Sequence, residues 1–126
     1  MPRTEIIFYR DDKGRAPVRD WLQTLRWRDR QAYSKCVSAI GRLAAEGHEL
    51  RRPIAAHLRA GLYELRVDRG RVHYRILYFF HGRNLVVLAH GLSKEDVVPG
   101  MDLQRALVRK ATYEEAPQNH THREEV

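Results

Sequence analysis

The sequence predicts a single α+β domain: an N-terminal strand, a helical hairpin, a three-stranded antiparallel meander and a short C-terminal helix. The chain has 126 residues, which is the length of one domain with one core. Apolar residues recur at helical spacing in the first half and follow strand patterns in the second half. Consecutive strands joined by tight turns make a meander, and the helical hairpin must pack on one face of it to bury its apolar side.

The first half of the chain predicts a strand and two helices. Residues 5–10 are rich in β-branched and aromatic side chains, which is typical of a strand. Pro17 suits the first turn of a helix, and Asp29 can cap a second helix that Gly47 ends. The apolar residues at helical spacing are Val18, Trp21, Leu22 and Leu25 in the first helix, and Tyr33, Cys36, Val37, Ile40, Leu43 and Ala44 in the second.

The second half predicts strands, after a polar link at residues 51–53. Residues 62–67 alternate, so that the apolar side chains face one way and Glu64 and Arg66 face the other. Residues 72–80 form the longest β-type run. Residues 85–90 are almost all apolar, which predicts a strand inside the sheet.

The C-terminal part predicts one short helix and then disorder. Residues 102–110 have the pattern of a closing helix. From about residue 112 the chain is polar and poor in apolar side chains. We therefore expect a folded domain over residues 1–111 and a disordered tail over residues 112–126.

The charge balance indicates a polyanionic partner. Lysine and arginine number 23 against 16 acids, a formal net charge of +7. Four glutamates and a single arginine lie in residues 112–126, so the rest of the chain is more basic still. Such a body attracts nucleic acid by steering and counterion release. An acidic protein partner would satisfy the same charge.

Several classes of protein are disfavoured by the sequence. There is no apolar run long enough for a membrane span and no secretion signal at the start. Cys36 is the single cysteine and lies on an apolar stripe, which predicts a buried, unreactive thiol in a cytoplasmic protein. No phosphate-binding loop, paired-cysteine zinc pattern or dinucleotide turn is present, so we expect no cofactor and no metal. His120 and His122 alone make a poor metal site.

Arginines on strands are the most informative chemical feature. Residues 51–83 contain eight arginines but only two acids, Glu64 and Asp68. Arg75 lies within the longest apolar strand, where a charge is costly unless it lines a cleft or finds a partner. Guanidinium groups match phosphate oxygens in geometry. The alternative is that Arg75 pairs with Glu64 across the hairpin and has a purely structural role.

Histidines and tyrosines near these arginines complete the candidate site. His90 ends the last strand beside a glycine and can exchange protons near neutral pH, although a lone histidine on an apolar strand is more often a satisfied core residue. His73 shares the strand face of Arg75 and is a second candidate. Tyr74 and Tyr78 can stack on unpaired bases.

A series of motifs runs in order from about residue 5 to residue 110. They are Pro17-Val18 with Trp21-Leu22 and Leu25, Gly61-Leu62-Tyr63-Glu64-Leu65-Arg66, Tyr74-Arg75-Ile76-Leu77-Tyr78-Phe79-Phe80, His90-Gly91-Leu92-Ser93-Lys94, Pro99, and Asp102 to Leu107. With these motifs the chain resembles the RelE/HigB toxin superfamily, in particular its branch of phage-derived HigB-like toxins. Three positions depart from the wider superfamily: Glu64 stands in place of a second lysine, Leu92 in place of an aromatic residue and Ser93 in place of a basic one.

The resemblance implies a RelE-like fold and the toxin of a type II toxin–antitoxin pair. Such toxins cleave messenger RNA without a metal, usually in the ribosomal A site, and are neutralised by a helix-turn-helix antitoxin. By position, Arg75 matches the arginine that contacts the scissile phosphate, and Arg66 matches a basic position on the preceding strand. His90 matches the His-Gly of the branch, and Lys94 lies near the basic residue after the last strand. The catalytic candidates are thus Arg66, Arg75, His90 and Lys94, and the RNA-binding candidates are Glu64, Arg71, His73, Tyr74 and Tyr78.

The expected reaction is attack of a ribose 2′-hydroxyl on the adjacent phosphate, which expels the 5′-oxygen. Permanently charged Arg66 and Arg75 suit charge stabilisation, whereas His90 suits proton transfer and Glu64 is a possible base. Two other readings stay open. One is a non-catalytic RNA- or ribosome-binding module, and the other is an interaction protein whose basic groove receives an acidic or amphipathic antitoxin-like segment.

Overall fold

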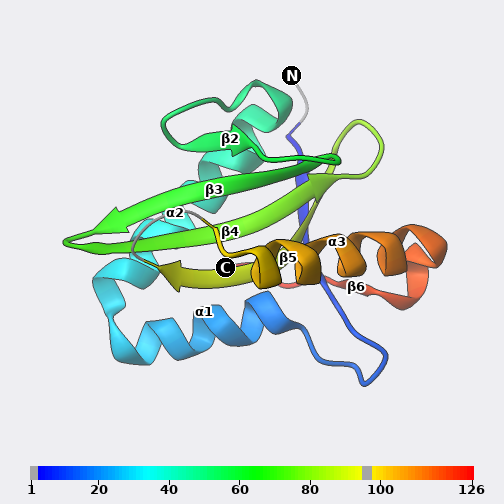
Figure 1. Cartoon of the computed structure of the whole chain (residues 1–126), viewed down its shortest axis with the longest axis horizontal. Coiled ribbons are helices and arrows are strands. Elements are labelled where there is room, and N and C mark those ends of the chain that lie inside the picture. The colour runs from blue at the N-terminus through cyan, green and yellow to red at the C-terminus, as the bar shows by residue number, and fades with distance from the viewer. Residues whose placement is uncertain (1–2, 95–97) are drawn as a thin grey trace.

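The computed structural model describes residues 3–94 and 98–126 and shows one α+β domain. In chain order the elements are β1 (Glu5–Tyr9), α1 (Pro17–Arg28), α2 (Arg30–Glu46), β2 (Ala55–His57), β3 (Leu62–Arg69), β4 (Val72–Phe80), β5 (Leu85–Lys94), α3 (Gly100–Glu115) and β6 (Thr121–His122), with 3-10 turns at Gly47–Glu49 and Pro117–Asn119. The strands form one sheet in the order β2-β3-β4-β5-β1-β6. Helices α1 and α2 cover one face, and α3 lies across the other (Figure 1).

The predicted helical hairpin is confirmed. Helix α1 starts at Pro17, and the Asp29 side chain caps α2 by accepting a hydrogen bond from the Ala32 amide at 3.1 Å. Gly47 ends α2 with a φ of 53°, which a glycine adopts without strain. The apolar stripe of α2 is buried against the sheet, and Cys36 and Leu43 at its centre are fully covered.

The predicted meander is also confirmed, with one strand more than expected. Strands β3 and β4 pair antiparallel around a turn at Gly70, whose φ is 60°. β5 lies inside the sheet between β4 and β1, as its apolar sequence predicts, and β1 pairs with it in parallel. The correction is β2, which lies in the segment expected to be a link and pairs with β3. A strand of three residues is too short to show a recognisable alternation of apolar and polar side chains.

The structure corrects the expectation of disorder in residues 112–126. Helix α3 runs to Glu115, well past the expected end, and β6 pairs antiparallel with β1 through Phe8 and Tyr9. Tyr113 and His120 are buried, and His120 Nδ1 lies 2.8 Å from the Arg10 carbonyl. The segment is fixed mainly by polar contacts to β1 and α1, which a reading of apolar patterns does not detect.

A bulge in β5 sets the orientation of its C-terminal half. Leu77 of β4 pairs with His90, but the next residue, Tyr78, pairs with Leu88, so β5 carries one extra residue at Ala89. His90 therefore faces α3, while Gly91 faces α1. Among the described residues, no helix has the length and apolar character that crossing a membrane requires.

Candidate functional site

The charged candidates gather on one face of the sheet, at the turn end of the β3–β4 hairpin. Arg66 lies directly opposite Arg75, and Asp68 lies opposite His73. Two apolar residues on this face of the same strands, Leu62 and Leu77, pack into the core beneath α3. The alternation predicted from the sequence therefore holds, and it brings these polar side chains onto the α3 side.

Arg75 is the most buried charge of the site. It is 3% exposed, and its Nη1 donates to the Tyr74 carbonyl at 2.9 Å and to Asp68 Oδ1 at 3.1 Å, with a longer contact of 3.4 Å to the Val67 carbonyl. The prediction that a charge here needs a partner is confirmed. The partner is Asp68 rather than Glu64, so the alternative of an Arg75–Glu64 pair is wrong in its detail.

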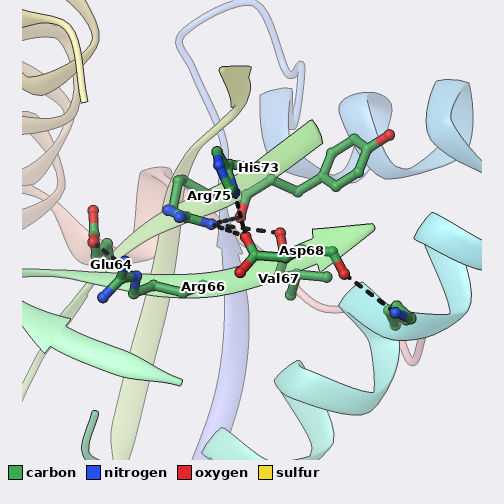
Figure 2. Close-up of polar contacts among 8 residues, drawn as sticks. Glu64, Arg66, Val67, Asp68, His73 and Arg75 are labelled. Atoms are coloured by element: carbon green, nitrogen blue, oxygen red, sulfur yellow. Dashed lines mark hydrogen bonds and ion pairs between the residues drawn. The ribbon is translucent and has the colours of Figure 1, made fainter. Parts of the chain in front are cut away.

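His73 and Asp68 form a second contact at the same point. His73 Nδ1 lies 2.7 Å from Asp68 Oδ1, and Figure 2 shows His73 and Arg75 converging on this carboxylate. The hydrogen bond from His73 is the largest influence that lowers the pKa of Asp68, and Arg75 adds to it. A carboxylate on Nδ1 fixes the ring of a histidine and leaves Nε2 for other partners. The side chain of His73 is 34% exposed, so it is open to solvent.

Arg66 and Glu64 form a separate pair farther along β3 (Figure 2). Arg66 Nε lies 3.5 Å from Glu64 Oε1, and the Arg66 side chain is 33% exposed against 12% for Glu64. Arg66 is thus the more accessible of the two strand arginines that face each other. Like charges directly opposite on two strands are unfavourable, and here each arginine has its own carboxylate.

His90, the predicted proton-transfer residue, is buried against α3, and both of its ring nitrogens have partners. Its Nε2 lies 2.6 Å from Asp102 Oδ1, and its Nδ1 lies 3.0 Å from Arg109 Nη1. Arginine only donates hydrogen bonds, so Nδ1 must accept one from Arg109. Nε2 therefore carries the ring proton and donates a hydrogen bond to Asp102. Burial, aided by the charge of Arg109, lowers the pKa of His90 against the opposing effect of Asp102. The ring is a neutral link between β5 and α3.

The structure also corrects the RNA-stacking role expected of two tyrosines. Tyr74 and Tyr78 point to the face opposite the arginines, where they are 7% and 1% exposed in the core under α1 and α2. Burial raises the pKa of the Tyr78 hydroxyl far above its usual value. Neither ring can reach a base. Arg71 is exposed in the hairpin turn, as an RNA contact requires.

Lys94 ends β5 and is paired in register with His73, so its backbone is at the same end of the sheet. Its side chain lies outside the described residues. Within the ranges that the structure describes, no group of three histidines, cysteines or acids is placed to hold a metal ion. Cys36 is buried and burial raises its pKa to about 12, which fits the predicted unreactive thiol.

Comparison with known proteins assigns the chain to a family. Residues 20–112 match the model of the phage derived protein Gp49-like family (DUF891). The chain belongs to this family. The Gp49-like family is itself part of the RelE/HigB-like toxin clan. A search of curated proteins finds no match to the chain. The matched range contains the helical hairpin except the first three residues of α1, and every candidate residue on β3, β4 and β5 of this Gp49-like protein.

Sequence reasoning missed three residues that define the site. In the sequence Asp68 stands out only as one of two acids among eight arginines, although its place opposite His73 in a hairpin with a two-residue loop is a usable signal. Asp102 and Arg109, which hold His90, are seven residues apart on α3 and so lie on one helix face. Their pairing with β5 depends on how α3 crosses the sheet, which no local pattern reveals.

Proposed function

We propose that this Gp49-like protein is the toxin of a type II toxin–antitoxin pair and cleaves messenger RNA, on the ribosome, by 2′-hydroxyl attack. The observation that carries the proposal is the convergence of His73, Asp68 and Arg75 beside Arg66 on one basic face of the hairpin. Membership of a family within the RelE/HigB-like toxin clan supports it. The partner proposed for the cell is a helix-turn-helix antitoxin.

His73 takes the proton-transfer role in this proposal, in place of His90. Asp68 binds Nδ1 at 2.7 Å, so the Nε2 lone pair is the site that accepts a proton. This is the arrangement in which a carboxylate fixes the tautomer and orientation of a general base. In the reaction, Nε2 removes the proton from the ribose 2′-hydroxyl, the 2′-oxygen bonds to phosphorus, and the bond from phosphorus to the 5′-oxygen breaks. The leaving 5′-oxygen takes a proton from water and becomes a 5′-hydroxyl, and the upstream fragment keeps a 2′,3′-cyclic phosphate.

The two arginines stabilise the charge that develops on the phosphate. Arg66, one third exposed, contacts the phosphate oxygens directly. Arg75 acts indirectly, because its Nη1 already binds Asp68 and the Tyr74 carbonyl. It holds Asp68, and through it His73, in position. Positioned charges of this kind contribute on the order of 100- to 1,000-fold in rate.

A non-catalytic RNA-binding module is the second candidate, and one observation favours it. His90, the matching histidine of the branch, is buried and held on both nitrogens. If His73 does not transfer protons either, the arginine face serves binding alone. The two candidates differ in what His73→Gln changes: a nuclease loses turnover, and a binder retains its affinity and its effect on growth.

The test is inducible expression in a bacterial host, with messenger RNA 5′ ends mapped minutes after induction. The wild-type protein is expected to arrest growth and to produce new 5′ ends within translated messages. His73→Gln is expected to lower cleavage by about 100-fold or more, the usual contribution of a general base. His57→Gln, at an exposed histidine of β2, is the matched control and should cleave like wild type. Growth arrest without new 5′ ends would contradict the nuclease.

A further inference from the structure

Trp27 is the most exposed large apolar side chain of the described residues. It lies in the last turn of α1 and is 87% exposed. The other tryptophan of the chain, Trp21, is half-buried and packs edge-on against Tyr74 at a ring separation of 6.3 Å. The core is thus complete without Trp27, and its indole ring is free to contact another molecule.

The surroundings of Trp27 are strongly basic. Residues 26–35, at the junction of α1 and α2, and residues 68–72, at the tip of the β3–β4 hairpin, together carry six cations and two acids. The six cations are Arg26, Arg28, Arg30, Lys35, Arg69 and Arg71. Both acids are engaged: Asp29 binds Arg69 at 2.8 Å and caps α2, and Asp68 binds His73 and Arg75.

The helical junction and the hairpin tip are physically joined. The Arg69–Asp29 pair links the tip to the junction, and Lys35 Nζ donates to the Asp68 carbonyl at 3.2 Å. Figure 1 shows the junction of α1 and α2 beside the turn of the hairpin. The junction that carries Trp27 and the hairpin tip thus form one basic region, which adjoins the candidate site at Asp68.

We propose that Trp27 and these cations form a second RNA-contacting surface, in which an unpaired base stacks on the indole ring and the cations bind the flanking phosphates. The inference rests on the proposed function and extends it. Aromatic rings set among cations are typical of surfaces that bind single-stranded nucleic acid. The excess of cations, with both acids already engaged, matches the charge of a phosphate backbone, and an acidic protein is the competing occupant that the test separates. The surface holds an RNA strand that continues from the cleavage face around the hairpin tip.

The test measures binding of a fluorescently labelled 2′-O-methyl oligouridylate by anisotropy. This probe lacks the 2′-hydroxyl nucleophile, so binding is measured without cleavage. Trp27→Ala is expected to weaken binding between roughly fivefold and a hundredfold, the range for losing one stacked base. Met101→Ala is the matched control, because Met101 is 78% exposed on α3, outside the basic surface. It should bind like wild type.

A second pair of variants tests the phosphate contacts. Arg28→Ala should reduce the slope of log affinity against log salt concentration by about 0.7, as expected for one lost contact to a single strand. Arg83→Ala, at an exposed arginine in the β4–β5 turn, should leave the slope unchanged.

Two results would overturn the inference. One is equal binding by Trp27→Ala and Met101→Ala. The other is Trp27-dependent binding of polyglutamate but not of the oligonucleotide, which would assign the surface to an acidic protein. A protein that binds the probe through Trp27 but cleaves no message would refute the nuclease and keep this surface. If the protein cleaves messages and Trp27→Ala binds the probe like wild type, the nuclease stands and this second surface is refuted.

Discussion

At the scale of single residues, identity alone did not separate the two histidines of the site. His73 and His90 both lie on the α3 face, yet one is one-third exposed and bound on a single nitrogen, whereas the other is buried and bound on both. The sequence predicted Arg66 and Arg75 as the charged pair and carried His73 as a second choice. It left a catalytic and a structural role open for His90, because the partners that distinguish them, Asp102 and Arg109, come from α3.

The lowered pKa of His90 predicts a pH dependence of stability. The folded state binds a proton at His90 less readily than the unfolded chain, whose histidine has a pKa of about 6.5. The stability that His90 contributes is therefore fully present above about pH 6.5 and is lost as the pH falls from there towards the folded pKa. Urea unfolding from pH 8 to pH 5 should show this loss in wild type. His90→Gln should remove that part of the slope, and His57→Gln should retain it; an unchanged slope in His90→Gln would contradict the neutral link.

At the scale of elements, close packing explains why glycine follows His90. A Cβ on Gly91 would lie 2.6 Å from two ring atoms of Trp21, so β5 and α1 approach each other only because this side chain is absent. The sequence predicted both elements and their packing. It did not predict the bulge at Ala89, which turns Gly91 towards α1, because a bulge depends on the register of two strands.

This contact predicts the effect of adding one methyl group. Gly91→Ala should lower the free energy of unfolding by about 1–3 kcal/mol, the usual effect of overpacking. Gly41→Ala is the matched control, since Gly41 lies on the outer side of α2 with nothing near its Cβ position. It should stabilise the protein by about 0.5–1 kcal/mol, because alanine is the better helix former. Trp21→Leu should relieve part of the Gly91→Ala effect; equal stability of wild type and Gly91→Ala would contradict the packing described.

At the scale of the whole molecule, the order of the longer strands and helices could be predicted from the sequence, whereas the two short strands at the edges of the sheet, β2 and β6, could not. Residues 112–126 return across β1, with Arg123 bound to Glu5 at 2.7 Å and Glu124 to Arg19 at 3.1 Å. Ion pairs between distant residues leave no periodic pattern. Glu124 thus binds Arg19 and Glu114 binds Lys110, so neither acid is paired with a cation of the hairpin tip or the helical junction.

Cleavage of RNA by this basic face can be tested through the chemistry of the cut ends. Purified protein is mixed with ribosomes programmed with a defined message, and both ends of each new cut are identified. Attack by the 2′-hydroxyl predicts a 2′,3′-cyclic phosphate on the upstream fragment and a 5′-hydroxyl on the downstream fragment, with both lost in His73→Gln. An intact message in every mixture, or fragments carrying a 5′-phosphate, would contradict the account.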